Sequence, residues 1–288
     1  MTNVEVRIRS SYQTLRGSEQ KAADYFLKHQ QDIFSLPIDE LAKRSGVSPT
    51  AWVRLCKAIG YDGLKDLRRQ LYDDKGDDKT ADPANDVYFA DLREGSTPEQ
   101  IIHTVTTTSE QALRNTSRLL DPAALKDAAK AILSADSIRL FGMGASALVA
   151  EDLYNKLLRI NKNAIFSRDS HIQLSYSSTL TKKSAAVFIS NTGSTEEVLQ
   201  ALEEAKKRGC HTIGITRYAK SPLSEGCDIL LYTSSPEAYI RSGAMSSRLS
   251  QLLAVDVLFT VLATQDYKEI KQPLESSYKI CLTHRVNS

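Results

Sequence analysis

The sequence predicts two folds in succession: an all-helical N-terminal domain and an α/β domain built on a doubly wound parallel sheet. The first 72 residues place apolar side chains at helical spacing between turn formers. From Ser137 onward, five short apolar runs alternate with helical stretches about as long as the crossovers between parallel strands. A chain of 288 residues also suggests about two domains. We therefore predict a helical domain over residues 1–75, a linker over 76–98 and an α/β domain over 99–288.

The N-terminal domain is predicted to contain short helices separated by tight turns. The first helix of interest covers about Asp39–Arg44, and Ser45-Gly46 forms the turn that follows. Ser48 is a good N-cap and Pro49 suits the first helical position, so a second helix begins there. A further helix begins near Leu64.

The linker is acidic, and the rest of the composition is ordinary. Residues 73–99 hold 3 Lys and Arg against 9 Asp and Glu, whereas residues 1–72 hold 12 against 8. A mildly basic domain followed by an acidic segment permits nucleic-acid binding without requiring it. No apolar run approaches the ~18 residues of a membrane span, and the four cysteines form no CxxC pair. We expect a cytoplasmic protein with no metal, no cofactor and no membrane partner.

The α/β domain opens with helices before its strands. Thr97, Pro98 and Gln100 combine an N-cap, a first-position proline and a capping-box residue, which predicts a long helix. A second helix restarts at Asp121 and runs to about Ser134. The five strand candidates read SIRLFG, NAIFS, SAAVFIS, HTIGIT and DILLYT, and the last apolar helix reads SSRLSQLLAVDVLFTVLA. Apolar strands flanked by helices indicate a parallel sheet covered on both faces, where ligands bind at the carboxyl ends of strands.

Two loops follow strands where such a ligand would bind. In the first, Gly142 and Gly144 let the backbone turn tightly, and Ser146 lies near the start of the next helix. Free N–H groups and the helix dipole at such positions favour an anion. Ser194 with Glu197 equally fits a capping box, so one loop alone is ambiguous, but two on neighbouring strands predict a pocket for a phosphate and the polyol behind it. The second loop consists of Ser190, Asn191, Thr192, Gly193, Ser194 and Thr195.

The first loop also fits a dinucleotide-binding pattern, Gly-x-Gly-x-x-Ala, through Gly142, Gly144 and Ala147. That pattern expects an acidic residue about 20 positions on, for the ribose. Asp169 lies 27 positions after Gly142. A dinucleotide site also does not need the second hydroxyl-rich turn, so nicotinamide binding is the weaker alternative.

These motifs together resemble a known family. The segments FGMGASALVAEDLYNKLLRI and VFISNTGSTEEVLQALEEAKKRG look like the sugar isomerase (SIS) domain, over about Asp136–Ala263. Ahead of them, ELAKRSGVSPTAWVRLCKAIGYDGLKDLRRQL resembles the N-terminal helix-turn-helix of the RpiR/MurR transcriptional regulators. The resemblance implies a flavodoxin-like SIS fold that binds a phosphorylated sugar.

The resemblance also implies which residues contact that effector. It assigns the phosphosugar to Ser146 and Ser190 and suggests that His171 faces the pocket, with a merely hydrogen-bonded histidine at a helix start as the alternative. The family's second loop usually carries an arginine where this chain has Ser194. The predicted effector site is Gly144, Ser146, His171, Ser190, Asn191, Thr192, Gly193, Ser194 and Thr195.

A helix-turn-helix places its second helix in the major groove, with early residues reaching base edges. Here Thr50 and Arg54 are predicted near bases, while Trp52 either plugs the core or lies near DNA. Family members often carry threonine where Ala51 stands. Basic residues and hydroxyls nearby would contact phosphates. The predicted DNA-binding residues are Lys43, Arg44, Ser48, Thr50, Ala51, Arg54 and Lys57.

The sequence predicts detection of a sugar phosphate rather than its conversion. Isomerisation needs a base beside the substrate carbon, and the nearby candidates Glu151, Glu197 and His171 form no acid–base set. We therefore predict a DNA-binding transcriptional regulator of carbohydrate metabolism controlled by a phosphorylated sugar. It would act on double-stranded operator DNA as a homodimer or a dimer of dimers. A sugar-phosphate isomerase with an appended DNA-binding domain is the alternative.

Overall fold

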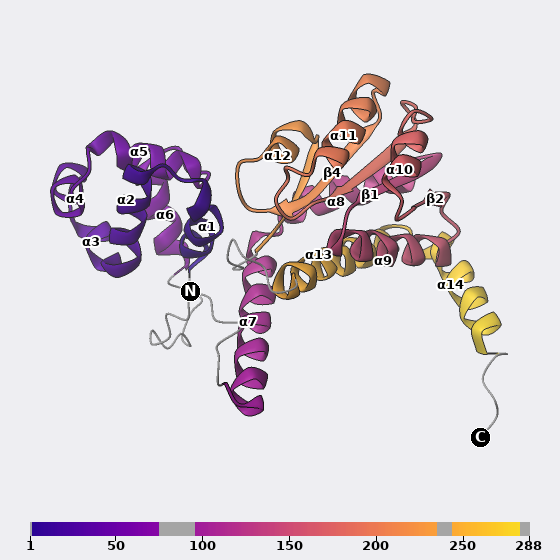
Figure 1. Cartoon of the computed structure of the whole chain (residues 1–288), viewed down its shortest axis with the longest axis horizontal. Helices are drawn as coiled ribbons and strands as arrows, with labels where there is room; N and C mark the ends of the chain where they lie inside the picture. Colours follow the sequence, from indigo (N-terminus) through magenta and orange to yellow (C-terminus); the bar gives the residue numbers. More distant parts are fainter. Residues whose placement is uncertain (1, 75–95, 235–243, 283–288) are drawn as a thin grey trace. The chain divides into compact units, whose positions relative to one another are not determined.

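The computed structural model describes residues 2–74, 96–234 and 244–282, and it divides into two compact units. The N-terminal unit consists chiefly of residues 1–108, and the α/β unit chiefly of residues 109–288. Figure 1 shows helices alone in the first and a helix-covered sheet in the second. Each unit has a hydrophobic core of its own.

The N-terminal unit is all-helical in its described part. Its core buries Phe26, Ile33, Trp52, Leu55 and Leu67, each with 0 % exposure. Burial of these apolar side chains is what stabilises a set of helices that would be marginal in isolation. The elements are α1 (Asn3–Ser11), the 3-10 helix η1 (Tyr12–Thr14), α2 (Gly17–Lys28), α3 (Gln30–Ser35), α4 (Ile38–Ser45), α5 (Pro49–Ala58) and α6 (Leu64–Asp74).

Helices α4 and α5 form the helix-turn-helix. α4 ends at Gly46, whose φ of 67° lies in the left-handed region that glycine adopts readily. Ser48 caps α5, because its Oγ accepts a hydrogen bond from the Ala51 N–H at 3.3 Å. Trp52 is a core residue whose Nε1 donates to the Ser45 Oγ at 3.0 Å. Of the two alternatives for this tryptophan, the structure supports the core plug.

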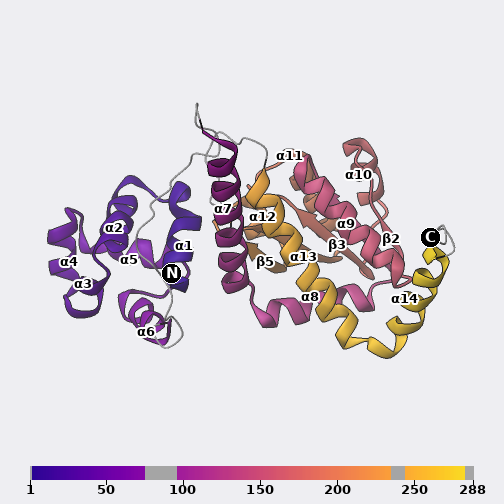
Figure 2. The same ribbon diagram turned by 90° about the horizontal axis from the view of Figure 1, so that it is seen from below.

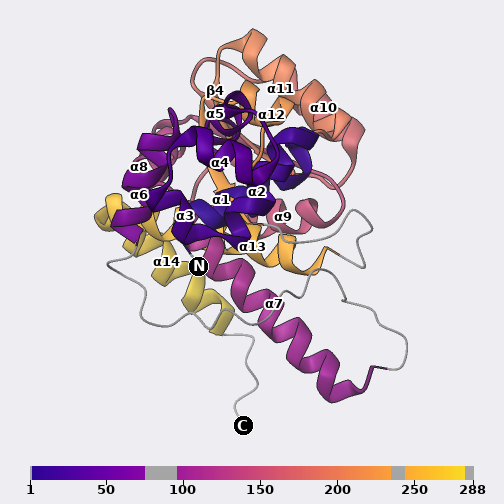
Figure 3. The same cartoon turned by 90° about the vertical axis from the view of Figure 1, so that its left-hand side faces the viewer.

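Two helices precede the sheet. α7 (Pro98–Leu119) begins directly after Thr97, as its capping pattern predicts, and Figure 3 shows it as one continuous helix. α8 (Pro122–Ser134) begins after Asp121, whose carboxylate accepts a hydrogen bond from the first turn. Most of the predicted linker, residues 76–95, lies outside the described residues.

Five parallel strands form the sheet of the α/β unit in the order β2-β1-β3-β4-β5. This is the strand order of a flavodoxin-like doubly wound fold, whose switch point lies between β1 and β3. The strands are β1 (Ser137–Gly142), β2 (Ala164–Ile165), β3 (Ser184–Ile189), β4 (His211–Arg217) and β5 (Ile229–Thr233). They coincide with the five apolar runs, so the predicted parallel α/β fold is confirmed.

Helices cover both faces of this sheet. On one face Ile138 and Leu140 of β1 pack among α8, α9 and α13. On the other face Phe141 of β1 stacks on Phe188 of β3 at 4.7 Å between ring centroids, under α10, α11 and α12. Figure 2 shows α9 and α13 side by side across the sheet. With α8, the covering helices are α9 (Ala145–Arg159), α10 (Ser170–Ser177), α11 (Glu196–Arg208), α12 (Pro222–Gly226) and α13 (Met245–Gln265), while α14 (Tyr267–Leu282) contacts α9 and α13.

Helix α13 is the one described helix long and apolar enough to cross a membrane by length and composition alone. Ala254, Val255, Leu258 and Leu262 on this helix have 0 % exposure and pack into the core beside the sheet. A helix that is apolar nearly all round is expected in such a buried position. Such an apolar helix could pack on the core or on a second subunit, and here it packs on the core. The sequence did not predict α14, which follows it.

Candidate functional site

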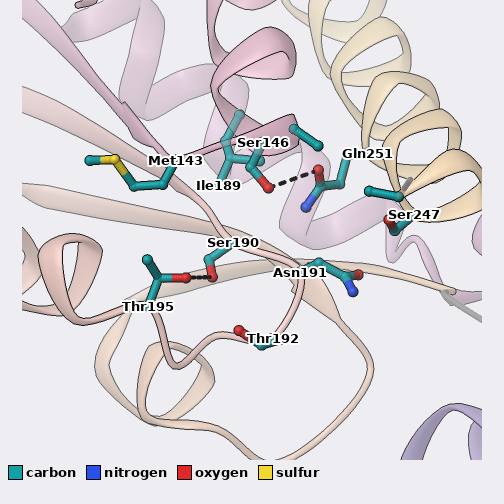
Figure 4. A pocket seen from close by; sticks show the side chains of 11 residues that line it. Met143, Ser146, Ile189, Ser190, Asn191, Thr192, Thr195, Ser247 and Gln251 are labelled. Carbon is teal, nitrogen blue, oxygen red and sulfur yellow. Dashed lines mark hydrogen bonds between the residues drawn. The ribbon is translucent and has the colours of Figure 1, made fainter. Parts of the chain in front are cut away.

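Strands β1 and β3 are neighbours, and their carboxyl ends meet at the same edge of the sheet, with Gly142 paired to Ile189. The loops after these strands and the first turns of α13 enclose a cavity of about 80 Å³. A water molecule takes about 30 Å³ in the liquid, so a group the size of a phosphate fits. The cavity, drawn in Figure 4, is lined by Met143, Ala145, Ser146, Ile189, Ser190, Asn191, Thr192, Thr195, Ala244, Ser247 and Gln251.

The loop between β1 and α9 presents Ser146 to the cavity. Gly142 is required here, because a Cβ at that position would lie 2.9 Å from the backbone oxygen of Ser146 and 3.3 Å from that of Ile189. The Ser146 Oγ donates to the Gln251 Oε1 at 3.1 Å, which joins this loop to α13. Both side chains are buried, at 8 % and 1 % exposure.

The loop between β3 and α11 folds back on Ser190. The Ser190 and Thr195 hydroxyls hydrogen-bond at 3.0 Å, and the Gly193 N–H donates to the Ser190 Oγ at 3.2 Å. Gly193 has a φ of 65°, in the left-handed region. The turn thus brings hydroxyls and backbone N–H groups together at one end of the cavity.

Three helices start at this cavity, and none of them has a side-chain cap. The N-cap residues of α9, α11 and α13 are Gly144, Thr195 and Ala244, and none makes a side-chain hydrogen bond to its helix. The other helices of this unit with an assigned N-cap, α8, α10 and α12, are capped by a side chain. Thr195 turns its hydroxyl to Ser190, so the capping box suggested for Ser194 and Glu197 does not form. First-turn N–H groups left uncapped at a helix N-terminus suit an anion.

Five of the nine predicted effector residues line the cavity: Ser146, Ser190, Asn191, Thr192 and Thr195. Gly144 and Gly193 shape the two loops without lining it. Ser194 is exposed, and its Oγ donates to the Thr192 carbonyl at 3.4 Å. His171 is exposed at the start of α10, outside the lining, where its backbone N–H donates to Asp169 at 2.8 Å. His171 therefore lies outside the described lining of this cavity.

The α13 side of the cavity was not predicted from the sequence. Ser247 and Gln251 lie one turn apart on α13 and are buried at 2 % and 1 % exposure. The sequence did contain a signal for them, namely two polar residues at positions i and i+4 of an otherwise apolar helix, which lie on one face. Buried polar side chains in an apolar helix mark a place where they meet other polar groups.

The described lining of the cavity carries no titratable side chain. Hydroxyls, an amide pair, backbone groups and apolar side chains make up the whole of it. Asp169, the acidic residue considered for a dinucleotide ribose, instead accepts hydrogen bonds from the backbone of α10 as its N-cap. The site can therefore hold an anion by neutral donors and helix dipoles.

Helix α5 presents a separate candidate surface in the N-terminal unit. Thr50, Arg54 and Lys57 are exposed and follow one another at helical spacing on one face of α5. The opposite face buries Trp52 and Cys56 at 0 % exposure. Burial raises the pKa of the Cys56 thiol to about 12, so that the thiol stays neutral inside the core. Ser48 and Lys43 are also exposed beside this face.

Two of the predicted DNA-binding residues have other contacts. Ala51 is only 3 % exposed, so its methyl group faces the core rather than solvent. The inward turn follows from helical spacing, because Ala51 is the fourth residue before Leu55, which is fully buried. Arg44 is exposed but makes ion pairs with Asp32 at 3.2 Å and Glu40 at 3.1 Å, and hydrogen bonding to Glu40 raises its pKa.

A helix-turn-helix unit joined to a ligand-binding α/β unit is the architecture of an effector-responsive transcriptional regulator. The sequence pattern of the helix-turn-helix domain, rpiR family, matches residues 2–77, and that of the SIS domain matches residues 131–261. The chain belongs to the rpiR family of helix-turn-helix transcriptional regulators and carries an SIS domain.

Two relatives that are HTH-type transcriptional regulators support this assignment. An HTH-type transcriptional regulator of Caldanaerobacter subterraneus is 32 % identical over 100 % of both chains. The HTH-type regulator YbbH of Bacillus subtilis is 34 % identical over 91 % of this chain and 90 % of its own.

Solved structures share the fold. The NanR protein of Vibrio vulnificus, solved with ManNAc-6P, is 27 % identical, with a TM-score of 0.62 over 99 % of this chain and 100 % of that one. The sugar isomerase domain of an RpiR transcription factor from Sphaerobacter thermophilus is 22 % identical, with a TM-score of 0.56 over 62 % of this chain and 99 % of that one.

Proposed function

We propose that this regulator binds a phosphorylated sugar in the cavity of its SIS domain and that this binding changes its affinity for operator DNA. The observation that carries the proposal is the meeting of three uncapped helix N-termini at one hydroxyl-lined cavity. Each helix N-terminus is equivalent to about half a positive charge. The three N-termini together can stabilise a bound phosphate, although the described lining contains no cationic side chain.

The phosphate is assigned to the turn before α11. Ser190, Thr192 and Thr195 offer three hydroxyls there, and α11, which begins beside them, has no side-chain cap. Ser146 approaches from the β1–α9 loop. Hydrogen bonds to a charged group contribute about 1.5–3 kcal/mol each, so a few of them suffice for micromolar affinity.

The cavity supports detection better than catalysis. Moving a proton between sugar carbons needs a side chain with a pKa near the working pH. The described lining offers none, since it consists of hydroxyls, amides and apolar groups. We therefore propose a sensor, and a turnover assay tests the alternative, a sugar-phosphate isomerase.

The NanR structure supports the same choice of ligand. That protein was solved with ManNAc-6P, a phosphorylated sugar, and its fold matches this chain along nearly its whole length. The identity of 27 % covers both the helix-turn-helix and the SIS domain. We propose that this chain binds a ligand of the same class, a phosphorylated sugar.

The exposed face of α5 is assigned to the major groove. We propose that Thr50 and Arg54 reach base edges and that Ser48 and Lys57 reach phosphates, and the exposure of all four residues supports this. Because one helix-turn-helix reads only a half-site, we propose a homodimer or a dimer of dimers. Its place of action is the cytoplasm, where operator DNA is accessible.

Contacts inside the α/β unit suggest a route for the response. Ser250, beside Gln251 on α13, donates to the Ala112 carbonyl of α7 at 3.5 Å. The Ser234 N–H after β5 donates to the Thr116 Oγ1 of α7 at 3.0 Å. A ligand that binds one arrangement of these helices better than another shifts the population by that difference in affinity. α7 follows the linker in sequence and is the element proposed to transmit the shift.

Arg54→Ala is expected to weaken operator binding about 5- to 150-fold, the range for loss of one good base contact. Sugar-phosphate affinity should not change, since Arg54 lies in a unit with its own core. Fluorescence anisotropy with labelled operator measures the first quantity and calorimetry the second. Lys28→Ala, on α2, controls for the loss of one positive charge. Wild-type operator binding by the Arg54 variant would remove this residue from the interface.

The cavity is tested by thermal unfolding of the full chain against a panel of phosphorylated sugars, with NAD(H) included. A ligand at 100 times its Kd stabilises the folded state by about 2.7 kcal/mol, or roughly 5–10 °C in Tm. Ser190→Ala should lose most of this shift and keep effector-free operator binding. Stabilisation by NAD(H) alone, or turnover of the stabilising sugar phosphate, would contradict the proposal.

A further inference from the structure

Gln251 on α13 has one half of its amide satisfied and the other half open. Its Oε1 accepts a hydrogen bond from the Ser146 Oγ at 3.1 Å. Its Nε2 is buried and has no hydrogen-bond partner among the described residues, although the residue is only 1 % exposed. Figure 4 shows this amide directed into the pocket.

A buried donor without a partner is unfavourable, and native proteins retain few of them. The hydrogen bond from the Ser146 hydroxyl to the Gln251 Oε1 fixes the orientation of the Gln251 amide. With the Oε1 bound to Ser146, which also lines the cavity, the Nε2 of Gln251 faces the cavity. Such a group suits a ligand that brings an acceptor oxygen to it.

The position of Gln251 assigns it to the part of the ligand away from the phosphate. Ser190, Thr192 and Thr195 gather on the turn before α11, while Ser247 and Gln251 stand on α13 at another wall of the cavity (Figure 4). A sugar phosphate seated with its phosphate on the α11 turn then points its carbon skeleton toward α13.

We propose that Gln251 is a specificity-determining residue, whose Nε2 donates to an acceptor oxygen on the carbon skeleton of the effector. The inference rests on the proposed function of the cavity and narrows its ligand class. A hydroxyl or an acyl carbonyl accepts such a hydrogen bond, whereas a free ammonium cannot. The described lining has no carboxylate to pair with an ammonium, and a buried unpaired charge is costly. We therefore expect a phosphorylated neutral or N-acylated sugar to bind more tightly than a free amino sugar phosphate.

The test uses the full chain and three probes: inorganic phosphate, the N-acylhexosamine and hexose 6-phosphates, and the hexosamine 6-phosphates. Gln251→Met keeps the length of the side chain and removes the amide. We expect its ligand-free Tm to stay close to that of the wild type, because removal of the unpartnered donor is offset by loss of the hydrogen bond from the Ser146 Oγ. Affinity for the best neutral sugar phosphate should fall about 10-fold, while weak binding of inorganic phosphate stays the same.

Gln251→Glu provides the second variant and keeps an acceptor for Ser146. We expect it to lower affinity for neutral sugar phosphates and to raise the relative affinity for hexosamine 6-phosphates by about 10-fold. Wild-type affinity and selectivity in both variants would overturn the inference and leave the proposed function intact. A large loss of ligand-free Tm in Gln251→Met, with binding of all probes reduced equally, would make the amide structural and would also overturn it. No binding of any sugar phosphate by the wild type would instead overturn the proposed function.

Discussion

Gly193→Ala is expected to lower sugar-phosphate affinity by roughly 100-fold, or about 2.7 kcal/mol, and to destabilise the SIS domain. A Cβ at this position would lie 2.2 Å from the Ser221 Oγ, 2.8 Å from the Ser221 Cβ and 3.1 Å from the Thr216 Oγ1. The φ of 65° adds a backbone strain of about 1 kcal/mol for a residue with a side chain. Ser221 cannot turn away freely, because it caps α12 through a hydrogen bond from the Ser224 N–H at 3.2 Å.

The loop must therefore move, and it carries Ser190 and Thr195 with it. The Gly193 N–H and the Ser190 Oγ would lose their 3.2 Å hydrogen bond, which holds the turn closed. Calorimetry with the sugar phosphate found in the thermal screen measures the affinity. Thermal unfolding measures the stability, for which we expect a loss of about 2–4 kcal/mol from strain and collision together.

Gly209→Ala is the matched control. Gly209 has nearly the same φ, 68°, but the nearest atoms to its Cβ would be Lys182 side-chain carbons at 3.5 and 3.7 Å. It ends α11 at the opposite end from the cavity. We expect a loss of about 1 kcal/mol from the backbone term alone and wild-type affinity. Equal losses of affinity in both variants would show that Gly193 acts only through global stability.

Most of the fold could be predicted from local patterns. Five continuous apolar runs predicted five strands, because only a parallel sheet covered on both faces buries every side chain of a strand. β3 shows this directly, since all six residues of Ser184–Ile189 are buried. N-cap and proline pairs at Ser48, Thr97 and Asp121 predicted three helix starts to within one residue. α14 was missed because Pro273 lies inside it and breaks the expected pattern.

The candidate site was only half visible in the sequence. Loops that follow β1 and β3 could be paired in advance, because parallel strands deliver their carboxyl ends to one edge. The contribution of α13 could not, since about 105 residues separate Ser146 from Gln251 and only tertiary packing joins them. Gly193 and Ser194 were predicted as ligand contacts because they belong to the hydroxyl-rich loop that begins at Ser190. The turn instead buries Gly193 against Ser221 and directs Ser194 to solvent.

Trp52→Ala is expected to destabilise the N-terminal unit by about 3–5 kcal/mol, the usual cost of truncating a buried aromatic side chain to alanine. Trp52 has 0 % exposure, its indole N–H donates to the Ser45 Oγ at 3.0 Å, and its ring is T-shaped to that of Tyr25 with 6.2 Å between centroids. Small domains are stable by only about 5–15 kcal/mol in total, and often by less. Operator binding should therefore fall sharply at 37 °C, and thermal unfolding should gain an early transition.

Sugar-phosphate binding should survive the same substitution, because the SIS domain has two core clusters that contain no residue of α1–α6. Trp52→Phe fills most of the space, loses only the indole donor and should cost about 1–2 kcal/mol, with operator binding retained. DNA binding can be lost because the N-terminal unit unfolds or because a DNA contact is removed. Arg54→Ala should remove a contact without adding an early unfolding transition, so it distinguishes the two causes. A Trp52→Ala protein that binds operator normally would contradict the core role. One that loses sugar-phosphate binding as well would mean that the two units depend on each other for folding.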